Sequence, residues 1–241
     1  ITVRLVKGAY WDSEIKHAQE RGLAGYPVFT RKCNTDVSYL ACARRLEALS
    51  EVIYPQFATH NAHTVAYIAE LFGERGRFEF QRLHGMGEEL YSQIVEGDWG
   101  RYPVRVYAPV GAHEDLLPYL VRRLLENGAN TSFVNRIIDA SLPAAAVIAD
   151  PVAEVDALSS VPHPRIALPS ALFGAQRTNS AGLNFADPAE REPLQLAVQQ
   201  ARGQVWHGGS PGGGGATVRI MNPALESELV GEMRFATAAA A

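Results

Sequence analysis

The sequence predicts an α/β protein built on parallel strands, and three observations lead to that prediction. Apolar, β-branched runs alternate with helical patterns four times over residues 1–128. Each apolar run ends in a polar or glycine-rich stretch. The spacing leaves room for a helix between successive strands, which parallel pairing requires. Four such units are compatible with a doubly wound sheet or with half of an eight-stranded barrel.

The elements are placed by the spacing of their apolar residues. Strands are predicted over residues 1–8, 53–58, 78–83 and 104–108, and helices from residue 12 and over 35–49, 62–72, 88–94 and 113–128. The first strand is predicted to be buried because it is apolar and β-branched. Asp12 or Ser13 is expected to cap the first helix, and Thr35 or Asp36 the second, because short polar side chains accept hydrogen bonds from first-turn N–H groups.

The pattern changes after residue 142. Residues 143–216 carry most of the prolines and the run GGSPGGGG, which is typical of a linker, apart from a short helix predicted near residues 152–158. From residue 217 the VRIMNP and SELVGEM segments favour a hairpin. The expected division is therefore a strand–helix domain at 1–142, a linker at 143–216 and a final segment at 217–241.

Composition argues against several classes of function. The 241 residues carry a net charge of −4 without a Lys/Arg-rich run, so nothing indicates nucleic-acid binding. Cys33 and Cys42 have neither a metal-binding spacing nor a secretory context, and we expect reduced thiols. No apolar run reaches the length of a membrane span, and no paired His/carboxylate pattern indicates a catalytic metal.

Polar and aromatic side chains gather directly after the four predicted strands, in the stretches KGAYW, ATHNAH, RLHGMG and YAPVG. The active sites of parallel α/β barrels lie at the carboxyl ends of their strands. These four stretches therefore contain the candidate site residues.

The first strand and the residues after it combine cations, a glycine and aromatic rings. Arg4 and Lys7 lie in an apolar context, where each cation needs an internal carboxylate or a bound anion. Gly8 would let a flat ligand approach the backbone closely. Tyr10 and Trp11 would offer aromatic faces to a ligand, or else would belong to the core.

Two further clusters are candidates for ligand binding. Thr59, His60 and Asn61 precede a helix, whose N-terminus favours anions, although the histidine equally suits a cap. Arg122 and Arg123 lie in the last predicted helix, and their forked guanidinium groups suit a carboxylate. A solvated helix face is the alternative for this pair. Because the sequence has no nucleophile elbow, triad order or phosphate loop, we expect a bound cofactor to carry the chemistry.

Six blocks of the sequence together resemble the proline dehydrogenase domain of the proline utilization A family. In the family's order, over residues 2–137, they are VRLVKGAYWDSEIKHAQ, GYPVFTRK, YPQFATHNAH, FEFQRLHGMGE, VYAPVG and YLVRRLLENGANTSFVN. The later segments IADPV, PHPRIALPSALFG, NSAGL and MNPALESELVGEM resemble the family's connector and the first strands of its aldehyde dehydrogenase domain. The resemblance implies the C-terminal half of a distorted (β/α)8 TIM-like barrel, followed by an extended linker and a truncated second domain at 217–241.

The resemblance also implies a reaction. FAD would take a hydride from C5 of L-proline to give Δ1-pyrroline-5-carboxylate, and the electrons would pass to a quinone. NAD would serve only the aldehyde dehydrogenase domain outside this chain. The parent protein would be cytoplasmic, with peripheral contact at the inner membrane. No nucleic-acid partner and no oligomeric state follow from this segment.

Individual residues match positions of the family's site. Arg4 matches an arginine near the flavin's reactive nitrogen, and Arg4, Arg122 and Arg123 are the expected catalytic residues. Other matches to flavin contacts are Lys7, Gly8, Trp11, Thr30, Lys32, Thr59, His60, Asn61, Gln81, Glu126, Ser132 and Phe133. Matches to the proline pocket are Tyr10, Leu83, Tyr107, Tyr119 and the arginine pair, which would hold the substrate carboxylate.

Two other functions stay open on the sequence. The family's first four strands, with a pocket lysine and its acidic partner, do not occur in it, so the chain by itself would be a catalytically inert structural piece. The second alternative is an aldolase-type barrel with Lys7 as the Schiff-base lysine. That alternative leaves the arginine pair unexplained.

We expect the isolated 241-residue chain neither to retain stoichiometric FAD nor to oxidise proline, because part of the family's flavin site is not encoded in it. The test is the flavin absorbance of the purified chain, combined with a proline-dependent dye-reduction assay. A stoichiometric flavin spectrum together with turnover would contradict this expectation.

Overall fold

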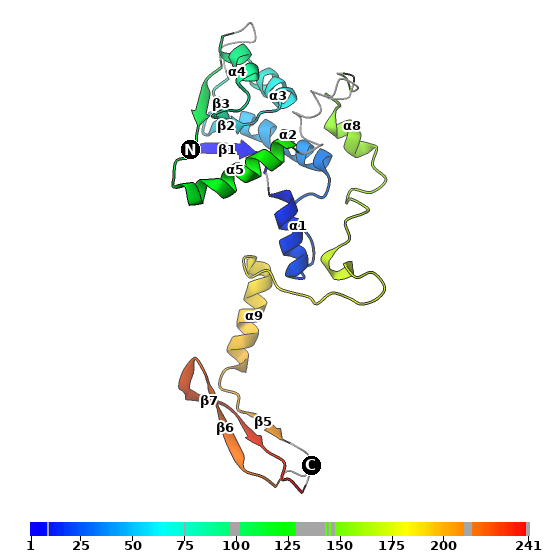
Figure 1. Ribbon diagram of the computed structural model, residues 1–241, viewed down its shortest axis with the longest axis vertical. Helices are drawn as coiled ribbons and strands as arrows, with labels where there is room; N and C mark the ends of the chain where they lie inside the picture. The colour runs from blue at the N-terminus through cyan, green and yellow to red at the C-terminus, as the bar shows by residue number, and fades with distance from the viewer. Residues whose placement is uncertain are drawn as a thin grey trace. The chain divides into compact units, whose positions relative to one another are not determined.

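The computed structural model describes residues 1–8, 10–74, 76–96, 102–128, 143, 145, 148–209 and 214–239. They form two compact units, residues 1–180 and 181–241, and each is described by itself. The first unit contains a four-stranded sheet with its helices, and the second contains one helix and a three-stranded sheet (Figure 1). None of the described helices combines the length and apolarity needed to cross a bilayer.

The four-stranded sheet confirms the prediction of an α/β fold with parallel strands. Its strands follow chain order as β1 (Thr2–Val6), β2 (Tyr54–Ala58), β3 (Glu79–Leu83) and β4 (Val104–Tyr107). Each neighbouring pair is parallel. Within the described residues β1 and β4 do not pair with each other, so the sheet is open and does not close into a barrel.

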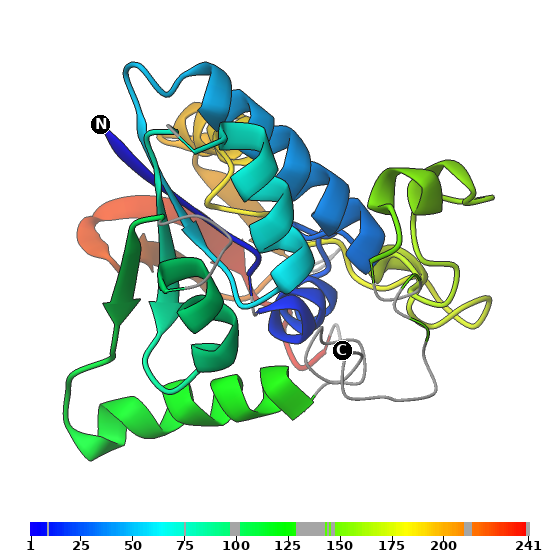
Figure 2. The ribbon, with the colours of Figure 1, turned by 90° about the horizontal axis from the view of Figure 1, so that it is seen from above.

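Three of the helices that follow these strands cover one face of the sheet. The helices are α1 (Trp11–Glu20), α2 (Lys32–Ala48), α3 (Ala62–Phe72), α4 (Glu88–Val95) and α5 (His113–Gly128). Helices α2, α3 and α4 pack on the aromatic core, and α2 and α3 lie side by side (Figure 2). Phe57, Phe78 and Phe80 are at most 1% exposed, and the ring centroids of Phe78 and Phe80 are 5.1 Å apart. Edge-to-face aromatic packing of this kind adds to the burial energy of the core.

The helix caps differ from the predictions. The cap of α1 makes no side-chain hydrogen bond, so neither Asp12 nor Ser13 caps it. Helix α2 begins before Thr35 and Asp36, which therefore lie inside it. The Asp36 carboxylate contacts two lysine ammonium groups instead of the free backbone N–H groups. Asn61, in contrast, caps α3 by accepting a hydrogen bond of 3.1 Å from a first-turn N–H.

The first strand is not buried, contrary to the prediction. Its residues alternate between exposed and half-buried, and Val6 is 45% exposed. Strand β1 is an edge strand of the described sheet, paired with β2, so less of the fold covers it. Arg4 is accordingly exposed, and its guanidinium carbon lies 4.7 Å from the centroid of the Tyr107 ring on β4.

Part of the predicted linker belongs to the first unit and packs against its helical segments. The short helix α8 (Pro151–Asp156) lies where a helix was predicted, and a 3-10 turn, η1 (Pro169–Ala171), follows it. Tyr26 donates a hydrogen bond of 2.5 Å to the Ala167 carbonyl, and Asn34 donates one of 3.2 Å to the Val161 carbonyl. These bonds attach residues 150–180 to the segments around α1 and α2.

The second unit contains the predicted hairpin and an unpredicted helix. Strands β6 (Thr217–Asn222) and β7 (Leu225–Arg234) are antiparallel, and β5 (Trp206–Gly209) adds to β7 in parallel. Helix α9 (Pro188–Ala201) was missed because its two prolines suggest a linker. Pro188 is the first helical residue, where a missing N–H costs nothing, and Asp187 caps the helix.

We expect Phe80→Ala to lower the free energy of unfolding by about 3–5 kcal/mol, because it opens a cavity in the aromatic core. Phe29→Ala is the matched control, since Phe29 is 49% exposed, and it should cost far less. Urea unfolding followed by circular dichroism measures both variants. Equal losses would show that the core is not centred on the ring of Phe80.

Candidate active site

The sheet face opposite the aromatic core is polar. Because side chains alternate along a strand, the residues next to Phe57 and Phe80 point away from the helices. In register, Arg4 lies opposite Gln56, Gln56 opposite Glu79, and Gln81 opposite Arg105. We term this surface the polar face; it comprises Arg4, Tyr54, Gln56, Glu79, Gln81, Arg105 and Tyr107.

Glu79 is the centre of the polar face. Its Oε1 accepts hydrogen bonds from Arg105 Nε at 2.7 Å, and from the side-chain amides of Gln56 and Gln81 at 2.8 Å each. Its Oε2 accepts from Arg105 Nη2 at 2.9 Å and from the Tyr54 hydroxyl at 3.4 Å. The hydrogen bonds from Arg105 outweigh the effect of burial and lower the pKa of Glu79 to about 2. An ionised carboxylate therefore connects β2, β3 and β4.

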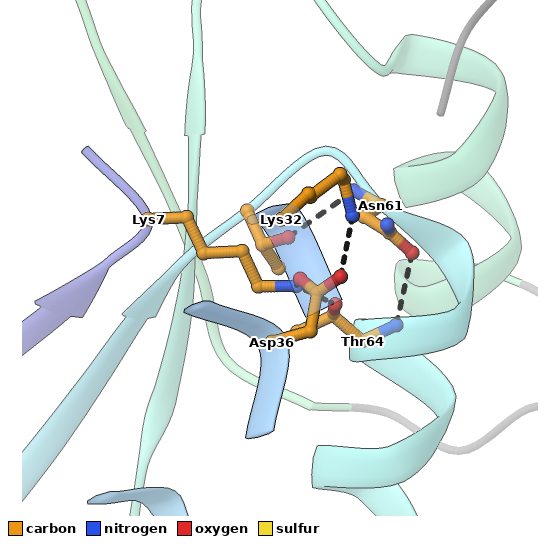
Figure 3. A network of polar contacts seen from close by, with 6 residues as sticks. Lys7, Lys32, Asp36, Asn61 and Thr64 are labelled. Atoms are coloured by element: carbon orange, nitrogen blue, oxygen red, sulfur yellow. Dashed lines mark hydrogen bonds and ion pairs between the residues drawn. The ribbon is translucent and has the colours of Figure 1, made fainter. Parts of the chain in front are cut away.

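A second polar cluster lies at the carboxyl end of β1 (Figure 3). Lys7 Nζ is 2.6 Å from Asp36 Oδ1 and donates a hydrogen bond of 3.2 Å to the Thr64 hydroxyl. Lys32 Nζ is 2.5 Å from the other carboxylate oxygen of Asp36. One carboxylate thus serves two ammonium groups, which leaves one positive charge beside the start of α3. We term these four residues the lysine cluster.

Burial and charge oppose each other in the lysine cluster. Burial lowers the pKa of Lys7, and the neighbouring Asp36 only partly offsets that effect. Burial by itself raises the pKa of Asp36, but the charges and hydrogen bonds of Lys7 and Lys32 bring it below the usual value. The prediction that Lys7 needs a partner is met by an internal carboxylate. Sequence reasoning missed Asp36 because it was assigned to a helix cap.

The loop after β2 brings backbone and side-chain groups to the same edge. The hydroxyl of Thr59 accepts a hydrogen bond of 3.1 Å from Asn61 N–H. His60 Nε2 accepts one of 3.1 Å from the backbone N–H of Leu83. This bond requires an unprotonated Nε2, so neutral His60 carries its proton on Nδ1. Burial, together with the charges of Arg123 and Arg82, lowers the pKa of His60 and favours this neutral form.

Gly87 provides the space that the His60 ring occupies. It has a φ of +66°, a conformation that suits glycine, and a Cβ there would lie 3.1 Å from His60 Cδ2. The Tyr91 hydroxyl also donates a hydrogen bond of 2.7 Å to the Thr59 carbonyl. The loop before α4 and the loop before α3 are therefore packed together around the imidazole.

Both arginines of the predicted pair lie against aromatic rings. The guanidinium carbon of Arg122 is 5.3 Å from the Tyr10 ring centroid, and that of Arg123 is 5.5 Å from the Tyr119 ring centroid. Both arginines are half-buried, so the pair does not form a solvated helix face. Although the two positions are adjacent on the helix, neither side chain is fully exposed to solvent. Arg122 Nε is buried and makes no hydrogen bond to a described residue. A buried donor in that state needs an acceptor.

The remaining predicted residues lie apart from these clusters or outside the described residues. Trp11 is 43% exposed and donates a hydrogen bond of 2.9 Å to the Phe29 carbonyl. Thr30 accepts one of 2.9 Å from the His163 N–H. Gly8 is exposed, and a Cβ there would meet no atom within 4 Å. The Glu126 side chain, Ser132 and Phe133 lie outside the described residues.

The arrangement offers three kinds of recognition. The lysine cluster and the start of α3 suit a phosphate-like anion. The polar face suits a flat ring with polar edges, and the arginine pair suits a carboxylate. The part of the chain that the structure describes has no group of three His, Cys, Asp or Glu side chains able to hold a metal.

Comparison with known proteins gives a consistent set of relatives. The proline dehydrogenase family matches residues 1–136. The bifunctional protein PutA of Escherichia coli is 53% identical over 254 aligned residues, which cover 98% of this chain and 19% of that protein. PutA of Rhizobium meliloti is 48% identical, with 97% and 20% coverage. A crystal structure of a proline utilization A mutant from Bradyrhizobium japonicum is 55% identical, with a TM-score of 0.77 over 83% of this chain and 20% of that one. The chain thus spans about a fifth of the length of these relatives.

We expect Glu79→Gln to flatten the pH dependence of the unfolding free energy in acid. The pKa of Glu79 is about 2 in the folded chain, so its stabilisation is present above the unfolded pKa, near 4.5, and is lost as the pH falls towards 2. One pKa unit corresponds to about 1.4 kcal/mol, and exposure of Arg105 to solvent reduces the total effect to about 2 kcal/mol.

Chemical unfolding at several pH values between 3 and 7 measures this slope for the wild type and the variant. Glu70→Gln on the exposed side of α3 is the matched control and should keep the wild-type slope. An unchanged slope in Glu79→Gln would show that Glu79 does not stay ionised in the fold.

Proposed function

The chain belongs to the proline dehydrogenase family, and we propose that it binds FAD and takes part in the oxidation of L-proline to Δ1-pyrroline-5-carboxylate. The observation that carries the proposal is the meeting of Arg4 with Tyr107 and of Arg122 with Tyr10. These four residues come from β1, β4, α5 and the start of α1. They are the positions that the family resemblance assigns to the flavin's reactive edge and the proline pocket.

The described residues fit FAD in two zones. The charges of Lys7, Lys32 and Asp36 sum to one positive charge beside the N-terminus of α3, where the diphosphate would bind. Gln81 and Arg4 lie further down the strands, on the polar face, where a flat ring can be held. The neutral His60 contributes an Nδ1–H donor next to the first zone. FAD, when bound, supplies the acceptor for the hydride of proline.

The arginine pair would bind and orient the substrate. The unpaired Nε of Arg122 can donate to a carboxylate, and the aromatic rings under both guanidinium groups limit their movement. Two guanidinium groups bind a carboxylate in a defined orientation, which places the proline ring relative to the polar face. The charge of Arg4 would stabilise negative charge that develops at the reactive edge of the ring during hydride transfer.

We further propose that the four strand–helix units are half of a (β/α)8 barrel. In a flat sheet, three strand spacings would place β1 and β4 about 14 Å apart. The contact between Arg4 and Tyr107 across this span indicates that the sheet bends towards its polar face. The division into a barrel segment at 1–142, a connector at 143–216 and the start of an aldehyde dehydrogenase domain at 217–241 belongs to the same proposal.

The proposed partners follow from the same family membership. L-Proline is the substrate, a quinone accepts the electrons, and the protein works in the cytoplasm in peripheral contact with the inner membrane. Lys7 as a Schiff-base lysine is not favoured, because its ammonium is engaged by Asp36 and Thr64 and because the family match is to proline dehydrogenases.

We expect Arg122→Lys and Arg123→Lys, made in the complete flavin-containing protein, each to raise the KM for proline by about 10-fold or more. A lysine ammonium cannot replace a bidentate guanidinium, and the loss falls on substrate binding. Steady-state kinetics of proline-dependent dye reduction measures the effect.

Arg45→Lys, at an exposed position on α2, is the matched control and should leave the KM unchanged. A KM within about twofold of the wild type in both pair variants would contradict the assignment of the carboxylate site. Absence of any proline-dependent reduction in the wild-type protein would contradict the proposed function itself.

A further inference from the structure

We propose that Glu79 is a positioning residue that fixes the side-chain amide of Gln81, so that Gln81 Oε1 accepts a hydrogen bond from the N–H of the flavin ring. The inference rests on the proposed function, because it assumes that the ring lies on the polar face. It adds a residue that neither the motifs nor the family resemblance pointed to.

The chemistry of Glu79 determines which way the amide points. Gln81 Nε2 donates to Glu79 Oε1 at 2.8 Å. An ionised carboxylate only accepts hydrogen bonds, so the reverse orientation, with Gln81 Oε1 facing Glu79, would place two acceptors against each other. The orientation of the amide therefore follows from charge, and Oε1 must lie on the side away from Glu79.

The Glu79 carboxylate also accepts hydrogen bonds from side chains on the two neighbouring strands. Arg105 donates to both carboxylate oxygens, at 2.7 and 2.9 Å, and a residue on the neighbouring strand, Gln56, donates to Oε1 at 2.8 Å. Glu79 is itself only 4% exposed. The carboxylate is thus surrounded by donors and cannot change partners without leaving one of them unpaired, which is costly in a buried site.

Gln81 Oε1 lacks a donor among the described residues. Gln81 is only 6% exposed. The nearby Tyr91 hydroxyl donates mainly to the Thr59 carbonyl, at 2.7 Å, with the Gln81 backbone carbonyl at 3.4 Å as its second acceptor, and it does not donate to the Gln81 side chain. A side-chain carbonyl oxygen to which no described residue donates can accept a hydrogen bond from a bound ligand. The oxidised isoalloxazine ring carries one N–H, on its pyrimidine edge, and otherwise presents acceptors there. A fixed acceptor on the polar face therefore matches that N–H, whereas a freely rotating amide could present its NH2 instead.

The test uses the complete protein purified with its flavin. Glu79→Gln replaces the carboxylate with an amide that can donate to Gln81 Oε1, so the amide of Gln81 can turn over. The NH2 group of Gln81 would then face the N–H of the flavin ring, so that two donors face each other. We therefore expect the dissociation constant for FAD to rise by about 10-fold or more. We also expect the flavin absorption bands to shift, since a hydrogen bond to the ring changes.

The exchanged variant Glu79→Gln/Gln81→Glu distinguishes a positioning role of Glu79 from a purely structural role. It keeps volume and net charge, and position 81 lies directly opposite Arg105, so the moved carboxylate keeps an arginine partner. Its second oxygen would restore an acceptor for the ring. We expect FAD affinity within about threefold of the wild type and wild-type absorption bands. Glu70→Gln, the same change at an exposed position on α3 outside the polar face, is the matched control and should change neither.

Gln81→Leu keeps the pair of Glu79 and Arg105 and so tests the inference even where Glu79→Gln does not fold. It should weaken FAD binding by about 10-fold and shift the bands as Glu79→Gln does. Unchanged affinity and bands in Gln81→Leu would overturn the inference, as would weakened binding with unshifted bands, because the contact would then lie away from the ring. Failure of the exchanged variant to recover would assign Glu79 a structural role only. A wild-type protein without flavin or proline oxidation would refute the proposed function instead.

Discussion

The ionised carboxylate of Glu79 is the interaction on which the polar side of this sheet depends. A parallel sheet covered by helices on one face still has to satisfy the polar groups on the other. Here one carboxylate receives donors from β2, its own strand β3 and β4, while aromatic side chains of the same strands form the core on the opposite face. The three strands are thus connected twice, once through apolar packing and once through a charge.

The lysine cluster repeats the same principle at the carboxyl end of the strands. Asp36 on α2 holds Lys7 from β1 and Lys32 from its own helix, and Thr64 on α3 adds a hydroxyl. Burial disfavours each charge taken by itself, but the two ammonium groups keep the carboxylate ionised. The excess of one positive charge remains next to a helix N-terminus, an arrangement that favours an anion.

Sequence reasoning recovered the alternation of strands and helices in the first unit because apolar periodicity is a local property. The sequence-based prediction was wrong where a side chain could bind either of two partners. Asp36 has the chemistry of a cap, yet it lies inside α2 because two lysines compete for its carboxylate. Helix α9 was missed for a different reason. A proline usually ends a helix, and the sequence alone did not show that Pro188 lies in the first turn, where proline is tolerated.

By itself the sequence determined the parallel α/β class, the four strand ends that carry the polar residues, and the family to which those residues belong. These depend on local spacing and on residue identity, which need no coordinates. Only the tertiary structure decided which groups meet: Arg4 with Tyr107, Arg122 with Tyr10, and Glu79 with its donors from three strands. Such contacts join residues far apart in the chain, and they depend on strand register and sheet curvature, which no local pattern encodes.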